Sequence, residues 1–479
     1  MTQAVKKDFN PIHFAIFCVI ALSGWFIPAV APITTEGMRL LTVFLAAIYG
    51  WTVTAEPWPS FMVLVFVPFT GLINQAGTIA LSWGTDATLF MVMLMILVGF
   101  LEATGATSYV ASFLMTRKFL KGHPWRLIFM LFLVAWILAS VGQIGAGMFI
   151  TWGFIYKICG MLGYKPYDKF STLMVFGVAV MGALSLSAVP WANNALVILS
   201  SYMATSGEQI NYVHYMAYSL PVGLFSIIGF LGLCKFVFKL DVSRLKDFDA
   251  SQFDAKDAEL TTERKIALLS LAILILVIVV PSVLPPTNPV RVFSDSMGLS
   301  MKAALLFAVL GLIKVEGRQV FNFPQLAAKS VPWNMVMMIC AIYCFVGLLG
   351  NEAAGISAFL GKLFTPMFAG KSTFVLFLLI MVITIFLTNF MINMVVAVIM
   401  ISATLPVVAT LGIDPLQVVY LITVSCTIAF MLPPASAASC ILFANTEWVK
   451  AKDIYKYAVP TIILIAVVAL VWNLIMFSF

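Results

Sequence analysis

Apolar stretches of membrane-spanning length recur along almost the whole of this 479-residue chain. A helix needs about 20 mostly apolar residues to cross the roughly 30 Å hydrocarbon core of a bilayer. Candidate spans lie near 11–33, 38–53, 60–75, 86–102, 168–202, 214–239, 264–284, 298–315, 331–350, 413–445 and 455–477. The pattern predicts an all-α polytopic membrane protein with about 11 transmembrane helices.

Composition supports the membrane assignment and excludes several other classes. Hydrophobic residues make up 62% of the chain and charged residues 10%, whereas a soluble domain carries roughly 25% charged residues. A disordered chain, a nucleic-acid-binding domain and a secreted disulfide scaffold are therefore excluded. The sequence contains no Gly-rich phosphate loop, zinc-spaced His/Cys cluster or nucleophile triad, so we expect neither an enzyme nor a bound cofactor.

The placement of Lys and Arg predicts the orientation in the membrane. With the N-terminus inside and one crossing per span, 22 of the 27 Lys and Arg residues fall on the cytoplasmic side. The polar segment 240–263 is then a cytoplasmic connector. We expect a plasma-membrane protein with its N-terminus in the cytoplasm and its C-terminus outside.

Two apolar stretches, near 127–157 and 372–411, are each too long for one helix and carry small or polar residues at their centres. Backbone turns at membrane depth must be buried in protein or line a cavity. We predict a re-entrant helical hairpin in each, the first entered from the inside and the second from the outside. The alternative for the glycines of the first stretch is close helix packing.

The two halves of the chain echo each other at a spacing of 250 residues. The matches are Trp83 with Trp333, Glu102-Ala-Thr-Gly105 with Glu352-Ala-Ala-Gly355, and Gln143 with Asn393. Five spans separate equivalent positions, so the repeats are predicted to be inverted, as in many secondary transporters. The expected divisions are an N-terminal helix over 1–37, a first repeat over 38–239, the connector 240–263 and a second repeat over 264–479.

Polar segments containing proline interrupt two of the long spans. These segments are Ser185-Leu-Ser-Ala-Val-Pro-Trp-Ala-Asn-Asn194 and Phe430-Met-Leu-Pro-Pro-Ala-Ser-Ala-Ala-Ser439. Proline removes a backbone donor and kinks or unwinds a helix. A discontinuous helix facing each hairpin tip would complete a substrate site near the bilayer midplane. A proline kink without a binding role is the alternative for each segment.

The candidate substrate-binding residues are the glycine, amide and hydroxyl residues at the two tips and the two breaks. They are Gly142, Gln143, Gly145, Asn193, Asn194, Asn389, Asn393, Ser436 and Ser439. No Lys or Arg lies near either tip, so we expect an anion to be held by neutral donors and helix N-termini. Asp86, Glu102 and Glu352 lie in or near membrane segments, either as structural residues at helix ends or as proton carriers.

Three motifs carry a resemblance to a known family. They are Thr54-Ala-Glu-Pro-Trp-Pro59, Leu387-Thr-Asn-Phe390 and Cys426-Thr-Ile-Ala-Phe-Met-Leu-Pro433. With them, the chain resembles the divalent anion/sodium symporter family, the dicarboxylate and sulfate carriers of the ion-transporter superfamily. The resemblance implies a homodimer with a scaffold domain and a transport domain that moves like an elevator.

The hairpin tips depart from the pattern of that family, which places Ser-Asn-Thr at each tip to hold sodium and a substrate carboxylate. Here the tips read Ile392-Asn393-Met394 and Gly142-Gln143-Ile144. A sodium ion near Gln143 and Asn393 would lack the hydroxyl ligands of the family. We therefore expect sodium, as a co-substrate, to matter less in this chain.

The sequence favours a secondary active transporter of small organic dianions, namely dicarboxylates such as succinate, malate, fumarate and 2-oxoglutarate. Sulfate or another carboxylate as the substrate, and exchange or proton symport as the coupling mode, are alternatives. A passive channel or an accessory membrane subunit is the alternative of a different class. The expected partners are a small anionic substrate, membrane lipid and a second copy of the chain, without nucleic acid.

Overall fold

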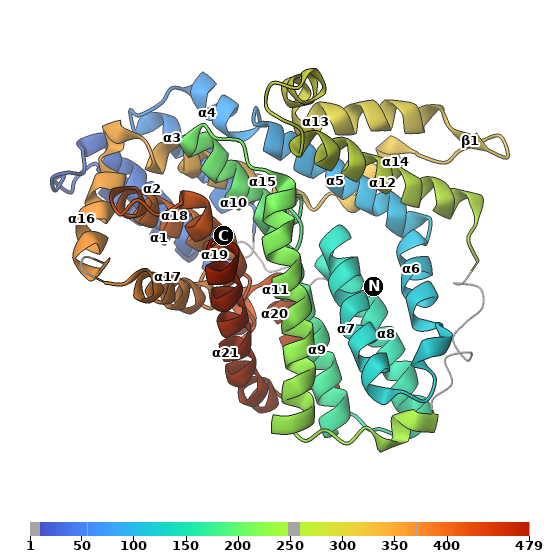
Figure 1. Cartoon of the computed structure of the whole chain (residues 1–479). Helices are drawn as coiled ribbons and strands as arrows, with labels where there is room; N and C mark the ends of the chain where they lie inside the picture. The colour runs from blue at the N-terminus through green and yellow to red at the C-terminus, as the bar shows by residue number, and fades with distance from the viewer. Residues whose placement is uncertain (1–9, 55, 248–258, 369–370, 479) are drawn as a thin grey trace. The chain divides into compact units, whose positions relative to one another are not determined.

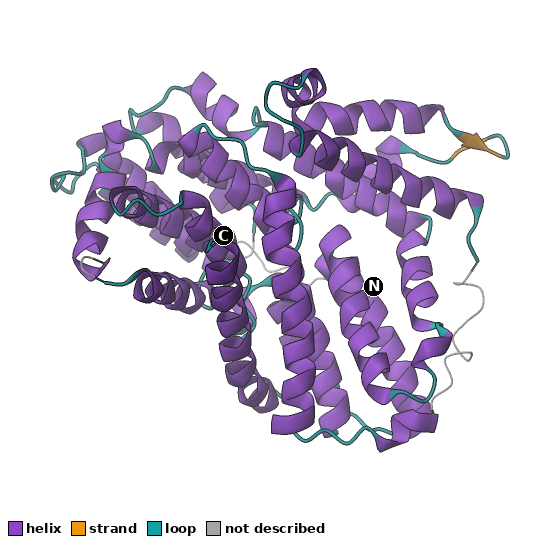
Figure 2. Ribbon diagram, viewed as in Figure 1, coloured by secondary structure: helices purple, strands orange, loops and turns teal. Residues whose placement is uncertain are grey.

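The computed structural model describes residues 10–54, 56–247, 259–368 and 371–478, which are almost entirely helical (Figure 2). The first eleven helices are α1 Pro11–Ser23, α2 Thr35–Val53, α3 Trp58–Phe69, α4 Gln75–Ser82, α5 Asp86–Ala103, α6 Ala106–Met115, α7 Pro124–Val141, α8 Ile144–Leu162, α9 Lys169–Leu184, α10 Asn193–Ser206 and α11 Tyr212–Gly232. The next ten are α12 Thr262–Ser282, α13 Pro289–Leu312, α14 Phe323–Ser330, α15 Trp333–Leu349, α16 Ile356–Phe368, α17 Thr373–Thr388, α18 Asn393–Thr410, α19 Pro415–Ser425, α20 Ala437–Ala444 and α21 Ala451–Met476. Strands β1 Lys314–Val315 and β2 Arg318–Gln319 form an antiparallel hairpin. The predicted all-α membrane fold is confirmed.

After α1, the helices form two series of ten that match in order, α2–α11 and α12–α21. The short helices α4 and α14 both have eight residues, and an asparagine caps each one, Asn74 and Asn322. Gly105 and Gly355 adopt left-handed φ angles of 70° and 65° directly before α6 and α16. The element order thus repeats at about the spacing seen in the sequence, while the inversion of the repeat stays a prediction.

The helices group into two compact units, and each unit combines helices of both series. Unit 1 comprises residues 1–85, 332–369 and 402–410, and unit 2 comprises 86–331, 370–401 and 411–479. In unit 1 the short helix α4 packs against α15. In unit 2 the equivalent short helix α14 packs against α5, which is the counterpart of α15. The same helix pairing therefore occurs once in each unit, with the two series exchanged.

Unit 2 is built around α9, whose residues from Phe170 to Leu184 are all buried. A helix that is apolar on every side requires neighbours all round. Helices α7, α8 and α20 pack against α9, and α11 packs lengthwise against α21 (Figure 1). The C-terminal end of α9, where the predicted polar break begins, is therefore enclosed by other helices.

Nine helices of the described chain are long and apolar enough to cross a membrane, compared with about eleven expected crossings. The difference arises mainly at the two expected hairpins and at short helices. Helices α7, α8 and α18 each reach membrane-spanning length, whereas α1, α3 and α19 have 13, 12 and 11 residues. Re-entry of the hairpins is thus still a prediction, since length alone allows α7 and α8 to cross.

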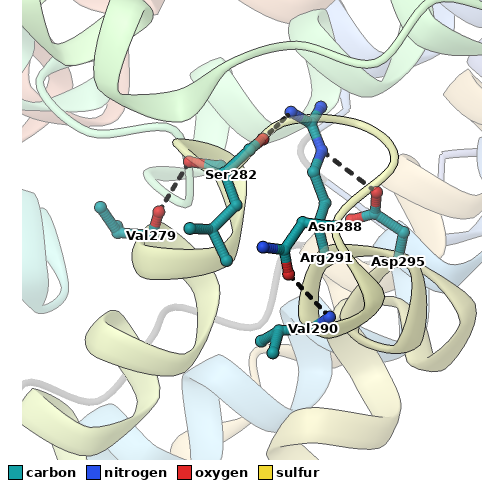
Figure 3. Close-up of polar contacts among 7 residues, drawn as sticks. Val279, Ser282, Asn288, Val290, Arg291 and Asp295 are labelled. Atoms are coloured by element: carbon teal, nitrogen blue, oxygen red, sulfur yellow. Dashed lines mark hydrogen bonds and ion pairs between the residues drawn. The ribbon is translucent and has the colours of Figure 1, made fainter.

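Helix α13 is interrupted at Gly298, where the backbone has φ 63° and ψ −172°. A Cβ atom there would lie 2.8 Å from Asp86 Oδ1, so both the backbone conformation and the close approach require glycine. Near the start of the helix, the Arg291 guanidinium donates to the Leu284 carbonyl at 2.6 Å and lies 3.5 Å from the Asp295 carboxylate (Figure 3). These contacts fix the corner between α12 and α13.

Candidate functional site

The first hairpin tip lies between α7 and α8, which run side by side (Figure 1). Gly142 ends α7, and Gln143 is the N-cap residue of α8 without a side-chain cap bond. A Cβ atom on Gly147 would lie 2.8 Å from the Ala139 backbone nitrogen, so this glycine permits close packing of the two helices. Close packing thus accounts for Gly147, while the uncapped first turn of α8 retains free N–H groups.

The side chain of Gln143 is exposed and donates through Nε2 to the carbonyl oxygen of Ser330 at 3.1 Å. Ser330 is the last residue of α14. A Cβ on Gly99 would lie 1.7 Å from the Ser330 hydroxyl, so Gly99 leaves the space that this serine needs. The first tip is therefore attached to the end of α14 by an amide that a ligand can reach.

The first polar break joins α9 to α10 through a short 3₁₀ turn over Ser185–Ser187. Helix α10 begins at Asn193 behind the N-cap residue Ala192, which offers no side-chain cap bond. The orphan N–H groups of such a helix start carry a partial positive charge and favour an anion. The predicted discontinuity of this helix is confirmed, and its second part starts without a cap.

Two buried donors at the start of α10 lack partners among the described residues. They are the indole Nε1 of Trp191 and the amide Nδ2 of Asn194. The two side chains are 5% and 4% exposed. A buried donor without an acceptor costs about 1–3 kcal/mol, so native proteins rarely keep one without a purpose. Both atoms can donate to an anion placed at the start of α10.

The second tip, between α17 and α18, is tied to the segment that follows α19. The Asn389 amide donates to the carbonyl of Ile428 at 3.0 Å, and its Oδ1 accepts from the Met431 N–H at 3.0 Å. The hydroxyl of Thr388 lies 2.9 Å from Asn393 Oδ1 and 2.8 Å from the Cys426 carbonyl oxygen. Both predicted asparagines are therefore brought to the second break and are buried there.

The second break, between α19 and α20, satisfies its own polar groups. The Ser436 hydroxyl donates to the Ala429 carbonyl at 2.6 Å and accepts from the Ser439 N–H at 3.1 Å, which caps α20. The Ser439 hydroxyl donates to the Leu432 carbonyl at 2.6 Å. This discontinuity was also predicted correctly, but its serines hold the chain's own backbone in this structure.

The two breaks and the first tip lie at one end of α9. The hydroxyls of Ser187 and Thr427 lie 3.4 Å apart, which joins the two breaks directly. A Cβ on Gly182 would lie 3.3 Å from Ile144 Cγ2, and one on Gly145 would lie 3.6 Å from Ile441 Cδ1. The first turn of α8 is therefore close to both the end of α9 and helix α20. Sequence reasoning placed these segments together but gave no partners for them.

The acidic residues that the sequence singled out occupy helix ends. Asp86 accepts from the N–H groups of Leu299 and Ser300 at 2.6 and 2.8 Å and from the Ser300 hydroxyl, so it caps the second part of α13. Glu102 lies in the last turn of α5, and one of its carboxylate oxygens is buried without a partner in the described ranges. Glu352 is exposed at the start of a short 3₁₀ turn.

The buried region around the breaks is electrically neutral. Within the described residues, the only buried charged side chain is Lys302, which lies on α13. Among the residues that the structure describes, no group of three or more His, Cys, Asp and Glu side chains is placed to hold a metal ion. Recognition of an anion at the breaks would therefore depend on amide, indole and backbone N–H groups.

Trp191, Thr388 and Thr427 are site residues that the sequence analysis did not select. Trp191 lies inside the first polar break, and a buried indole N–H normally requires an acceptor. That signal was available from the sequence. The roles of Thr388 and Thr427 depend on contacts between segments some 40 and 240 residues apart, which no local pattern shows.

Comparisons with known proteins agree with this architecture. The profile of the CitMHS family, described as citrate transporter, matches residues 44–369. The Na(+)/dicarboxylate cotransporter 3 of Rattus norvegicus is 29% identical over 130 residues, which are 27% of this chain and 21% of that protein. The crystal structure of the Alcanivorax borkumensis YdaH transporter matches with a TM-score of 0.57 at 16% identity, over 98% of each chain. The match to the rat protein thus spans about a fifth of its length, and the match to YdaH shows the fold.

Proposed function

Because this chain belongs to the citrate transporter family of the ion transporter superfamily, we propose that it is a secondary transporter that carries small organic dianions. The preferred substrates are dicarboxylates of four or five carbons, such as succinate, malate, fumarate and 2-oxoglutarate. The name of the rat relative, a Na(+)/dicarboxylate cotransporter, supports this class. The family description also makes citrate, with a third carboxyl group, a candidate.

The pair of unpartnered donors at the uncapped start of α10 is the observation that carries the proposal. Trp191 Nε1 and Asn194 Nδ2 can donate only, so the ligand group facing them must be an acceptor. A carboxylate presents two acceptor oxygens, and the free N–H groups of α10 add a third set of donors. In this proposal, one carboxylate of the substrate binds at α10.

The second carboxylate is proposed to lie toward the tips. Gln143 offers an exposed amide, and the uncapped first turn of α8 offers backbone donors. Asn193, Asn389, Asn393, Ser436 and Ser439 are proposed to complete the polar surroundings of the substrate. Gly142 and Gly145 leave space on either side of Gln143 and Ile144 at the first tip. Sulfate would engage only one of these groups, because its oxygens surround a single atom.

A ligand screen followed by counterflow tests the proposal. Purified protein is screened by thermal unfolding with dicarboxylates, citrate and sulfate, each with and without sodium. Proteoliposomes loaded with the best ligand should then take up labelled ligand faster than empty ones. Trans-stimulation is the behaviour of a carrier, and a passive channel does not show it. If none of the anions shifts unfolding and counterflow is absent, the transport proposal fails.

We further propose an elevator-type mechanism in a homodimer of the plasma membrane, with the N-terminus in the cytoplasm. The support is the family resemblance together with the excess of Lys and Arg on the predicted inner side. A cysteine introduced within 240–263 should react from the cytoplasmic side, and one at Phe479 from the outside. Reaction of both from the same side would contradict the inverted arrangement.

A further inference from the structure

We propose that a groove at the C-terminal end of α13 binds an anionic glycerophospholipid, with an acyl chain inside and the phosphate at its mouth. This lipid groove has a volume of about 420 Å³ and is lined mainly by Phe307, Ala308, Gly311, Phe321 and Phe323. It belongs entirely to unit 2. The inference goes beyond the transport function and does not depend on it.

Aromatic rings form the wall of the lipid groove. The ring centroids of Phe307 and Phe321 are 4.9 Å apart, and those of Phe307 and Phe323 are 6.2 Å apart. Phe321 also stacks edge-on against Phe100 of α5 at 5.3 Å. The wall is therefore fixed by packing on both sides. Such a rigid apolar surface favours a hydrocarbon chain over a polar ligand.

Small residues on α13 keep the lipid groove open. Ala308 and Gly311 are three residues apart, so they lie on the same face of the helix. A Cβ atom on Gly311 would have no neighbouring heavy atom within 4 Å. The space beside Gly311 is therefore available to a ligand, and a larger side chain at this helical position would fill it.

The lipid groove opens beside a stripe of exposed apolar residues on α13. Met301, Leu305, Val309 and Leu312 are 50%, 60%, 50% and 82% exposed. In a membrane-spanning helix, apolar side chains at one-turn spacing and high exposure face the acyl chains of the bilayer. Ala308 lies one turn from both Leu305 and Leu312, so an acyl chain can enter from the bilayer.

Basic residues follow immediately after the apolar end of α13. Lys314 and Arg318 lie in the β1–β2 hairpin and are exposed, and Glu316 is the acidic residue between them. Neither basic side chain forms an ion pair with another described residue. Basic groups at the end of a membrane helix attract phosphate headgroups of anionic lipids. This charge distinguishes an anionic phospholipid from a zwitterionic one.

Native mass spectrometry of the full-length protein, titrated with phosphatidylglycerol or phosphatidylcholine, tests the inference. The unmodified protein should bind one phosphatidylglycerol at least tenfold more tightly than phosphatidylcholine. Gly311→Phe should reduce that affinity at least tenfold by filling the groove, and Ala308→Leu should do so partially. Lys314→Gln combined with Arg318→Gln should lower phosphatidylglycerol binding to the level of phosphatidylcholine.

Matched variants control for nonspecific effects. Gly232→Phe, at another helical glycine with open space around it, and Lys450→Gln combined with Lys452→Gln should leave lipid binding unchanged. Thermal unfolding of each variant verifies that it folds. Equal affinities for the two lipids, or equal losses in the control variants, would overturn the inference. An altered oligomeric mass in Gly311→Phe with unchanged lipid affinity would assign the groove to a second copy instead.

Discussion

The two helix breaks of unit 2 occupy equivalent places in the two helix series, and both contain proline and polar residues, but they differ in how their polar groups are used. At the second break, Ser436 caps α20 and Ser439 bonds the preceding backbone. At the first break, α10 starts without a cap, and Trp191 and Asn194 keep buried donors without partners in the described chain. One break is complete by itself, and the other requires an acceptor.

This difference indicates that the two helix series have different roles in substrate binding. A self-capped helix start has less affinity left for an anion, because one of its orphan N–H groups, that of Ser439 in α20, already has a side-chain acceptor. An uncapped start with unpaired buried donors nearby gains charge-assisted hydrogen bonds when an anion arrives. We therefore expect the first repeat to hold a substrate carboxylate and the second repeat to shape the pocket around it.

Removing both donors of the first break should give the largest effect. Trp191→Phe combined with Asn194→Leu is expected to weaken substrate binding about 100-fold, since each lost bond to a carboxylate is worth about 1.4 kcal/mol or more. Without substrate, the double variant should be as stable as the original protein or more stable, because two unpaired buried donors are gone. Isothermal titration and thermal unfolding measure the two effects.

Matched residues with satisfied donors provide the control for that variant. Trp152, 3% exposed, donates to the Val175 carbonyl at 3.1 Å, and Asn473, 0% exposed, donates to the Gln417 carbonyl at 2.9 Å. Trp152→Phe and Asn473→Leu should lower stability and leave affinity unchanged. If the double variant instead loses stability without losing affinity, the polar groups of the first break serve the fold alone, as those of the second break do.

The amides at the two tips should each contribute a smaller share. Gln143→Ala and Asn393→Ala are each expected to weaken substrate binding at least tenfold, or about 1.4 kcal/mol, while expression and the oligomeric mass stay unchanged. Gln143→Ala should leave stability unchanged because its amide is exposed. Transport at the original rate and affinity in both variants would place the substrate away from the tips.

Loss of the cap at the second break should lower the stability of the protein more than its affinity for substrate. Ser436→Ala removes the side-chain acceptor of the Ser439 N–H, which costs about 1 kcal/mol. Affinity should fall less than in the tip variants. Thermal unfolding without substrate measures the change in stability, and the shift in unfolding temperature on adding substrate measures the change in affinity. A tenfold loss of affinity at unchanged stability would show that Ser436 contacts the substrate.

The smallest expected effect is that of sodium removal. Ile392 and Met394 flank Asn393, and no Ser or Thr lies among residues 142–145, so neither tip amide has a hydroxyl residue directly beside it in the sequence. Replacing external sodium with choline at fixed pH and membrane potential should lower uptake by less than about twofold. Backbone carbonyls and the hydroxyl of Thr388 are the remaining sources of sodium ligands. A steep, saturable sodium dependence would show that they suffice.

Much of this architecture follows from the sequence because it depends on length and apolar character. The all-α membrane fold, both helix breaks and the positions of the turns at both tips were predicted correctly. Clusters of glycine, proline and polar residues at membrane depth interrupt a helix, and the freed backbone must then be buried in protein or line a cavity. Gly105 and Gly355, which the sequence matches at a spacing of 250 residues, both adopt left-handed backbone conformations in the structure.

Hydrogen-bond partners could not be predicted in the same way. Gln143 and Asn393 look equivalent in the sequence, yet one donates to Ser330 and the other accepts from Thr388. Such choices depend on distant segments, which no local pattern encodes.

A structure of the protein with the dicarboxylate that stabilises it most would test the central claim directly. We predict a substrate carboxylate at the start of α10, with one oxygen within about 3.2 Å of both Trp191 Nε1 and Asn194 Nδ2. A substrate bound at α20, with Ser436 turned away from Ser439 and both donors of the first break still unpaired, would contradict the account.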